Sequence, residues 1–156
     1  MDKIVGIGEL AISNNLGDKL KTFALASCVG VTVYSPIRKV AGMIHVALPN
    51  PYEKEDGDNN PSYYAHTGIP LLINKICLEY GCLKGELEIN LYGGAESIRK
   101  NDVFNIGSKN ISAVKKILWD MYLKFNAIEI GGRVSRTLEM DVDTGTVKVI
   151  TQPITI

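Results

Sequence analysis

The sequence predicts a single α+β domain over residues 1–156, with layered, mixed and antiparallel β-sheets and two main helices packed on them. Two segments repeat apolar residues at helical spacing, whereas most other segments alternate apolar and polar residues as strands do. No internal repeat and no linker-like segment divides the chain. A length of 156 residues suits one domain and is enough to bury a core.

Four strands are predicted in the first part of the chain, at residues 3–13, 20–26, 28–34 and 40–48. The turn-forming sequence NNLGD follows the first strand, and SPIRK separates the last two. This short connection predicts an antiparallel hairpin. Pro49 ends the fourth strand, and the polar segment 50–64, rich in Asn, Asp and Pro, is expected to form an exposed loop.

Two helices and the remaining strands complete the predicted fold. The first helix carries its apolar residues at Ile69, Leu72, Ile73, Ile76, Cys77 and Tyr80. Pro70 belongs in its first turn, so Thr67 is the expected N-cap, and Gly81 suits the position after its end. The second helix is expected over 108–125, with apolar residues at Ile111, Val114, Ile117, Leu118 and Met121. Further strands are expected at 86–95, at 127–132 and in a hairpin over 136–150.

The charge balance gives the chain no general electrostatic reason to bind nucleic acid or an anionic membrane. Seventeen Lys and Arg residues balance 17 Asp and Glu residues, and the chain is 46% hydrophobic, as globular proteins are. The start MDKIVGIGEL does not have the pattern of a signal peptide, and no apolar run approaches the roughly 20 residues that cross a bilayer. Three cysteines, an odd number, argue against a disulfide framework. We therefore expect a soluble cytoplasmic protein without membrane insertion.

The predicted hairpin places Cys28 and His45 on the same face of its sheet. The opposite, apolar face carries Val29, Val31, Val33, Val40, Ile44, Val46 and Leu48. The apolar residues of both strands are expected on one face, because a slip of one residue would turn one set away from the core. Two registers satisfy this condition. One puts His45 directly opposite Cys28, with Cβ atoms roughly 4.5–5.5 Å apart, and the other puts His45 opposite Gly30, diagonal to Cys28.

This placement allows two interpretations of the two residues. A cysteine beside an imidazolium has a lowered pKa, which supplies a thiolate nucleophile at neutral pH. Alternatively, Cys28 is a small buried core residue and His45 is a buried, hydrogen-bonded one, since cysteine is among the most buried residue types. Cys77 and Cys82 do not have the spacing of a zinc site, and no further Cys or His cluster accompanies them.

The segments LASCVGVTVY and GMIHVALP, taken together, resemble the CheD family of chemoreceptor glutamine deamidases. The resemblance extends over nearly the whole chain. It includes VGIGEL near the start, YGGA at 92–95, NIGSKN at 105–110, and a glycine pair followed by Arg136 near the end. Ala26 stands where the family usually has glycine, and Glu129 stands where it usually has aspartate.

The resemblance implies a catalytic trio made of a cysteine nucleophile, a histidine base and a threonine. Cys28, His45 and Thr22 are the matching residues. It further implies a thioester mechanism that converts receptor glutamines to glutamate, with no metal or organic cofactor. Receptor methyl-ester hydrolysis is a possible second reaction of this scheme. The implied partners are the helical cytoplasmic domain of a chemoreceptor, as substrate, and the phosphatase CheC. Backbone N–H groups, including that of Cys28, are the expected oxyanion donors.

Two other hypotheses stay open at this point. The chain is alternatively a regulatory module that mainly binds receptors and CheC and turns over slowly. A third possibility is a cysteine hydrolase of the same fold that acts on some other amide. Measuring the mass of a receptor fragment after incubation separates the first hypothesis from the second, and a screen of other amides addresses the third.

Overall fold

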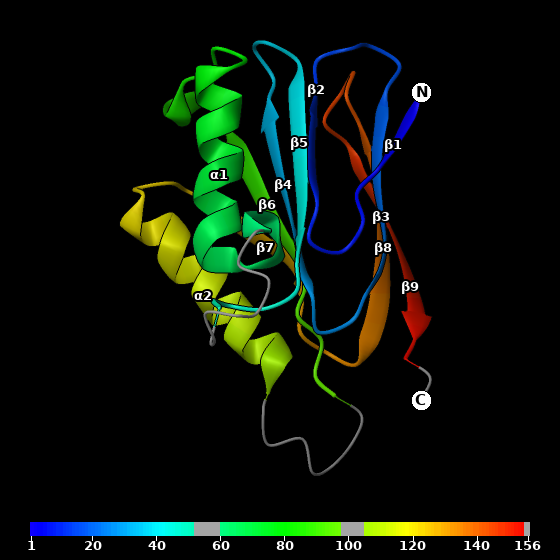
Figure 1. Cartoon of the computed structure of the whole chain (residues 1–156). Coiled ribbons are helices and arrows are strands. Elements are labelled where there is room, and N and C mark those ends of the chain that lie inside the picture. The colour runs from blue at the N-terminus through cyan, green and yellow to red at the C-terminus, as the bar shows by residue number, and fades with distance from the viewer. Residues whose placement is uncertain (52–59, 98–104, 155–156) are drawn as a thin grey trace.

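The computed structural model describes residues 1–51, 60–97 and 105–154 of the chain. These residues form two β-sheets and two α-helices in three layers, with the helices on one side and the sheets stacked beside them (Figure 1). The strands are β1 (Asp2–Ile4), β2 (Leu10–Ser13), β3 (Lys19–Leu25), β4 (Val29–Ser35), β5 (Val40–Val46), β6 (Glu88–Gly93), β7 (Asn126–Ile130), β8 (Val134–Asp141) and β9 (Val147–Pro153). The helices are α1 (Ala65–Leu78) and α2 (Ile106–Asp120), with short 3-10 helices at Pro61–Tyr63 and Lys84–Glu86.

The two sheets contain both parallel and antiparallel pairs, which confirms the predicted α+β class. The inner sheet has the strand order β2-β5-β4-β6-β7, and the outer sheet has the order β1-β3-β8-β9. All pairs are antiparallel except β1 with β3 and β6 with β7. The parallel β6–β7 pair requires a crossover, and α2 supplies it.

Both faces of β4 and β5 in the inner sheet are buried, each in a separate core. The helix-side core contains the valine-rich face of β4 and β5 packed against α1 and α2. The second core lies between the two sheets and includes Leu20, Leu25, Met43, Tyr92, Leu138 and Met140. Every residue of β4 and β5 is buried because the helices cover one face of these strands and the outer sheet covers the other.

The first predicted strand, 3–13, is wrong as a single element. The segment forms β1 and β2, which belong to different sheets, and residues between them cross from one sheet to the other. Gly8 has a φ of 75° in this crossing, a conformation that glycine adopts at low cost. The alternating apolar residues give the periodicity of a strand, but periodicity does not reveal a change of sheet.

Both predicted helices exist, with corrected ends. Tyr64 rather than Thr67 is the N-cap of α1, and Thr67 lies inside the first turn, where its hydroxyl donates to the Pro61 carbonyl over 2.5 Å. Gly81, with a φ of 73°, follows the helix as predicted. Helix α2 ends at Asp120 rather than 125, because Tyr122 adopts a left-handed φ of 60° and the chain then enters β7.

The predicted hairpins over 28–48 and 136–150 are confirmed as β4–β5 and β8–β9. In the first hairpin Gly30 pairs with His45 and Val29 with Val46. This is the register in which His45 lies diagonal to Cys28. The exposed loop predicted over 50–64 falls mostly outside the described residues, and Pro61–Tyr63 at its end form a 3-10 helix.

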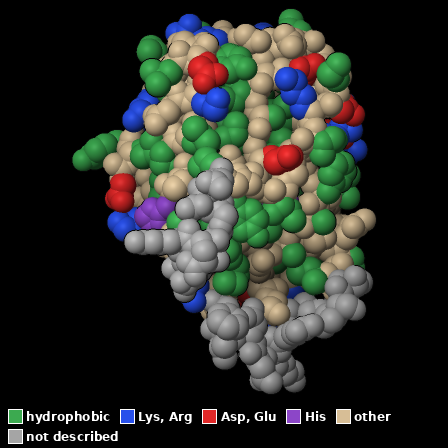
Figure 2. Space-filling view, in the orientation of Figure 1, with side chains coloured by type: hydrophobic (Ala, Val, Ile, Leu, Met, Phe, Trp, Pro, Cys, Tyr) green, Lys and Arg blue, Asp and Glu red, His purple; other side chains and the backbone are tan. Residues whose placement is uncertain are grey.

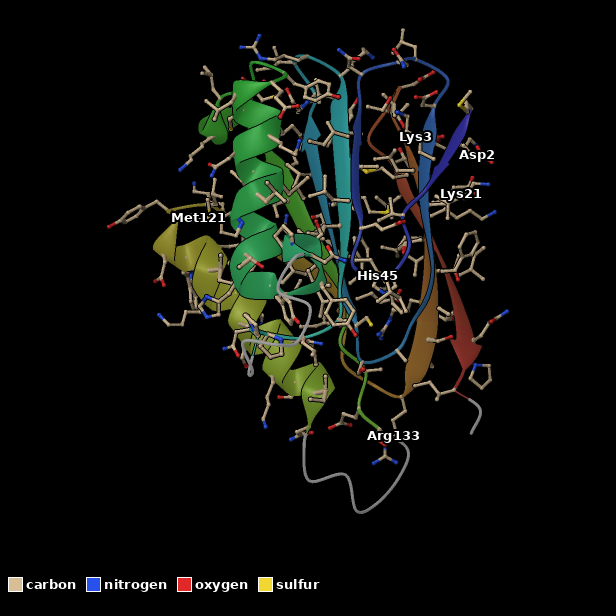
Figure 3. All side chains as sticks on the ribbon, viewed as in Figure 1. Asp2, Lys3, Lys21, His45, Met121 and Arg133 are labelled. Carbon is tan, nitrogen blue, oxygen red and sulfur yellow. The ribbon has the colours of Figure 1, made fainter. Side chains whose placement is uncertain are left out.

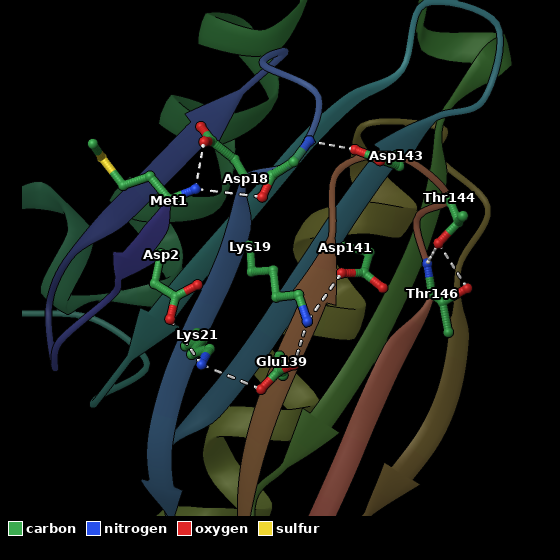
Figure 4. A network of polar contacts seen from close by, with 11 residues as sticks. Met1, Asp2, Asp18, Lys19, Lys21, Glu139, Asp141, Asp143, Thr144 and Thr146 are labelled. Atoms are coloured by element: carbon green, nitrogen blue, oxygen red, sulfur yellow. Dashed lines mark hydrogen bonds and ion pairs between the residues drawn. The ribbon is translucent and has the colours of Figure 1, made fainter.

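On the solvent face of the outer sheet, charge pairs support the register of β3 with β8 (Figure 4). Lys19 and Lys21 on β3 lie opposite Asp141 and Glu139 on β8, and Lys21 also pairs with Asp2. Such exposed pairs contribute little stability individually, but they disfavour other registers.

Basic and acidic side chains are also interspersed on the face shown in Figure 2. Neither helix in the described part of the chain is long and apolar enough to span a membrane.

Candidate active site

The three candidate residues come from three neighbouring elements. Thr22 lies on β3 of the outer sheet, His45 lies on β5 of the inner sheet, and Cys28 lies in the loop 26–28 that joins β3 to β4. His45 projects into the layer between the sheets, where Thr22 contacts it (Figure 3). Cys28 packs against the core between the sheets, so its side chain lies on the same side of the inner sheet.

The hydrogen bonds of Thr22 determine which nitrogen of His45 carries the proton. Thr22 Oγ1 lies 2.6 Å from the carbonyl oxygen of Val5 and 2.7 Å from His45 Nδ1. A carbonyl oxygen can only accept, so the single hydroxyl proton of Thr22 is donated to Val5. Nδ1 of His45 must then donate to Thr22. In the neutral imidazole this leaves Nε2 without a proton and able to act as a base.

Nε2 of His45 is buried and has no hydrogen-bond partner among the described residues. Both backbone polar groups of His45 bond to the segment that precedes β2: its N–H donates to the Glu9 carbonyl, and its carbonyl accepts from the Gly8 N–H. The Glu9 side chain in turn accepts the Gly6 N–H over 2.7 Å. The motif VGIGEL therefore runs beside β5 and fixes the backbone of the candidate base.

Burial keeps both candidate groups neutral in the resting state. It raises the pKa of the Cys28 thiol to about 11 and lowers the pKa of His45 to about 4. Burial thus favours a neutral thiol and a neutral imidazole in the free protein over the thiolate–imidazolium pair that the sequence allowed. The chemistry that the arrangement allows is a concerted one, in which the imidazole removes the thiol proton as sulfur attacks.

The loop that carries Cys28 is held by its carbonyl groups. The Ala26 carbonyl accepts from the Ala95 N–H over 2.7 Å, and the Cys28 carbonyl accepts from the Gly94 N–H over 2.8 Å. The Ser27 carbonyl, between them, accepts from the Asn110 side chain over 2.9 Å. Three consecutive carbonyl groups are thus satisfied, which fixes the conformation of the loop before any substrate binds.

Glycines allow the elements around this loop to approach closely. A Cβ on Gly93, whose φ is 97°, would meet the Cys28 carbonyl oxygen at 2.4 Å. A Cβ on Gly107, in the first turn of α2, would meet the Ala95 carbonyl at 2.1 Å. The motifs YGGA and NIGSKN therefore pack the end of β6 and the start of α2 against the nucleophile loop.

A partly buried ion pair joins the two sheets beside the loop. Arg136, on β8 and 5% exposed, donates to Glu129 on β7 over 2.9 Å. The Gly93 carbonyl accepts a longer bond from the same guanidinium and a 2.9 Å bond from the Gly131 N–H. Glu129 thus serves as an ion-pair partner that holds the end of β6, which lies next to Cys28.

Several residues of the site were not predicted from the sequence. Val5 and Asn110 stand in the motifs VGIGEL and NIGSKN, but the motifs did not reveal their roles, which depend on contacts across 17 and across 63 to 83 residues respectively. The other histidine of the chain, His66, is exposed at the start of α1. Cys77 and Cys82 pack in the helix-side core, and all three cysteines are free.

A separate groove of about 700 Å³ lies at the end of α2, lined by Trp119, Tyr122, Leu123, Lys124, Phe125 and Asn126. None of the candidate residues lines it. Among the described residues, no group of three or more His, Cys, Asp or Glu side chains is arranged to hold a metal ion.

Solved structures resemble the fold without sharing the sequence. The hypothetical protein YfiH of Bacillus licheniformis superposes with a TM-score of 0.51 at 11% identity, over 76% of this chain and 49% of that one. YlmD of Geobacillus stearothermophilus superposes with a TM-score of 0.54 at 9% identity, over 78% of this chain and 50% of that one. The chain therefore spans about half the length of these proteins, and the likeness concerns the fold alone.

Sequence comparison gives a closer relationship. A protein from Syntrophotalea carbinolica named probable chemoreceptor glutamine deamidase CheD is 46% identical over 151 residues, which cover 95% of this chain and 93% of that protein. The chemoreceptor glutamine deamidase CheD of Thermotoga maritima is 38% identical over 145 residues, or 93% of this chain and 88% of that protein. The model of the family described as CheD chemotactic sensory transduction matches residues 47–151. With relatives 46% and 38% identical over more than nine-tenths of its length, the chain belongs to the CheD family.

Proposed function

We propose that the protein is a chemoreceptor glutamine deamidase with Cys28 as nucleophile, His45 as general base and Thr22 as the residue that orients the base. The names of its relatives support the activity. The assignment of residues rests on Nε2 of His45, which carries no proton, has no hydrogen-bond partner among the described residues, and lies on the same side of the inner sheet as Cys28. The substrate is a glutamine side chain on the helical cytoplasmic domain of a chemoreceptor.

The reaction proceeds in two steps. Cys28 Sγ attacks the carboxamide carbon while Nε2 of His45 takes the thiol proton and then gives it to the departing ammonia. The thioester is next hydrolysed by water, whose proton passes to the same nitrogen and then to the leaving sulfur. The products are glutamate, ammonia and the regenerated thiol, and neither step requires a metal or an organic cofactor.

Thr22 stabilises the imidazolium that forms in each step. Its hydroxyl oxygen accepts from Nδ1–H while its own proton stays on the Val5 carbonyl. A neutral hydroxyl stabilises a cation less than a carboxylate does, so the enzyme is a modest catalyst compared with triads that contain aspartate. The same acyl-enzyme scheme also hydrolyses receptor methyl esters, because methanol replaces ammonia as the leaving group.

The cellular setting follows from this assignment. The protein acts in the cytoplasm, where the signalling domains of chemoreceptors lie, and it associates with CheC as other members of the family are expected to do. The runner-up function is a regulatory module that binds receptors and CheC and turns over slowly. The raised pKa of the Cys28 thiol favours slow turnover, but it does not remove the catalytic arrangement.

Intact-mass measurement of a receptor fragment tests the proposal. Each deamidation replaces NH₂ by OH and gives a defined mass gain, which we expect with the wild-type protein and not with Cys28→Ser. Cys77→Ser is the matched control, because this partly buried thiol packs against the helix-side core and should be dispensable. Receptor binding without any mass gain would support the binding module instead. An equal gain with Cys28→Ser would overturn the nucleophile assignment.

A further inference from the structure

Asn110 is a fully buried polar residue that contacts both parts of the candidate site. It lies on α2, and its Nδ2 donates to the Ser27 carbonyl over 2.9 Å and to the Ala47 carbonyl over 3.0 Å. Ser27 directly precedes Cys28, and Ala47 lies two residues after His45. One side chain therefore ties the nucleophile loop to the strand end that follows the base.

The orientation of the Asn110 amide is set by these two contacts. Turning the amide over would place Oδ1 against two carbonyl oxygens, which can only accept hydrogen bonds. In the observed orientation Oδ1 is buried and has no hydrogen-bond partner among the described residues. Both donors are thus used while the acceptor stays unpaired, an uncommon arrangement for a side chain that serves packing alone.

The contact with Ser27 determines where the Cys28 N–H points. The described residues contain no cis bond, so the peptide between Ser27 and Cys28 is trans and its C=O and N–H groups point in opposite directions. Because Asn110 fixes the C=O on the α2 side, the Cys28 N–H is directed away from α2. A hydrogen bond to the carbonyl also polarises the peptide and makes its N–H a stronger donor.

We propose that Asn110 is a positioning residue for catalysis, which orients and polarises the Ser27–Cys28 peptide so that the Cys28 N–H stabilises the oxyanion of the tetrahedral intermediate. This inference rests on the proposed deamidase function. Asn110 does not touch the substrate. It acts on the transition state through the peptide bond of the nucleophile, and it holds the end of β5 in place through Ala47.

Kinetics of Asn110→Ala on a receptor fragment test the inference. We expect kcat to fall about 10- to 100-fold with KM nearly unchanged, because the lost interaction strengthens only when the oxyanion forms. Alkylation of Cys28 by iodoacetamide involves displacement at a CH₂ group and forms no oxyanion. Its rate should therefore change less than threefold. A general loss of structure would slow deamidation and alkylation together, so a large loss of kcat with little change in the alkylation rate is specific to the oxyanion.

Ser13→Ala is the matched control. Ser13 is also buried and donates to Asp18 over 2.7 Å, but it pairs with Ala41 at the other end of β5 from His45. This variant should lose stability without losing kcat below its melting temperature. If Asn110→Ala does not fold, Asn110→Ser, which retains one donor, should show the same selective loss of kcat to a smaller degree.

The outcomes separate this inference from the proposed function. An inactive wild-type protein would overturn the deamidase assignment itself. An active wild type with an equally active Asn110→Ala variant would overturn only the role of Asn110. A parallel loss of deamidation and of alkylation would also overturn it, since the defect would then lie in the position of the sulfur.

Discussion

Thr22 and His45 belong to different sheets, yet Oγ1 of the first lies 2.7 Å from Nδ1 of the second. The contact forms only when the two sheets stack, so the orientation of the candidate base depends on the tertiary fold. The Val5 carbonyl completes the arrangement by taking the Thr22 proton over 2.6 Å. Tautomer, ring orientation and sheet stacking are therefore linked through one hydroxyl group.

Replacing Thr22 by valine should impair catalysis with little change in shape. The substitution leaves Nδ1–H and the Val5 carbonyl without their partner in a buried layer, which costs about 1–3 kcal/mol of stability. It also releases the orientation of the ring, so we expect kcat to fall about 10- to 100-fold. Thr22→Ser keeps the hydroxyl and should restore most of the activity. Equal kcat values for the valine and serine variants would show that the hydroxyl has no role.

The reactivity of Cys28 should follow the pH dependence of a neutral thiol. Burial raises the pKa of Cys28 to about 11, so the fraction of thiolate rises with each pH unit from neutral to alkaline pH. In the free protein, alkylation of the peptide that contains Cys28, measured by mass spectrometry, should therefore increase steadily from pH 6 to pH 10. A rate that is already constant from pH 6 upward would indicate a preformed thiolate–imidazolium pair instead.

Burial of neutral His45 should make the fold sensitive to acid. The pKa of His45 is lowered from 6.5 to about 4 in the folded state, so the unfolded chain binds the proton more readily in this range. Stability is therefore retained above pH 6.5 and lost as the pH falls toward 4, by about 3 kcal/mol. Urea unfolding at pH 7 and pH 4 measures this loss.

The His45→Gln variant is the control for this measurement. Glutamine does not titrate, so the variant should lose about 3 kcal/mol less than the wild type over the same pH range. The stability that the variant still loses between pH 7 and pH 4 then comes from protonation of acidic residues. If both proteins lose the same amount, protonation of His45 does not govern the acid sensitivity.

Gly93→Ala should be more damaging than Gly81→Ala, although both glycines have a positive φ. Its new Cβ would meet the Cys28 carbonyl oxygen at 2.4 Å, in addition to the unfavourable φ of 97°. We expect a loss of about 2–5 kcal/mol of stability and a lower kcat, because the nucleophile loop must move. Gly81→Ala is the control: it has a φ of 73° with nothing within 4 Å of a new Cβ, and should cost about 1–2 kcal/mol without affecting kcat. Thermal unfolding and turnover of the two variants check this difference.

The hairpin that carries the candidate base could be predicted because its information is local. Alternation places the valines of β4 and β5 on one face, and the four-residue connection between the strands limits their register, so His45 and Cys28 had to share the other face. The split of the first predicted strand into β1 and β2 could not be predicted. Both halves have the alternating apolar pattern of a strand. The chain crosses from one sheet to the other between them only because two sheets stack in the folded protein.

By itself the sequence determined the α+β class, the two helices, the common face of Cys28 and His45, and the family resemblance that singled out Thr22. These properties depend on periodicity, on turn residues and on motif order, all of which are written along the chain. The tertiary structure decided the tautomer of His45, the raised pKa of Cys28 and the anchoring of its loop by Asn110. Each of these depends on desolvation or on a hydrogen bond between distant segments, which exist only after the layers have packed together.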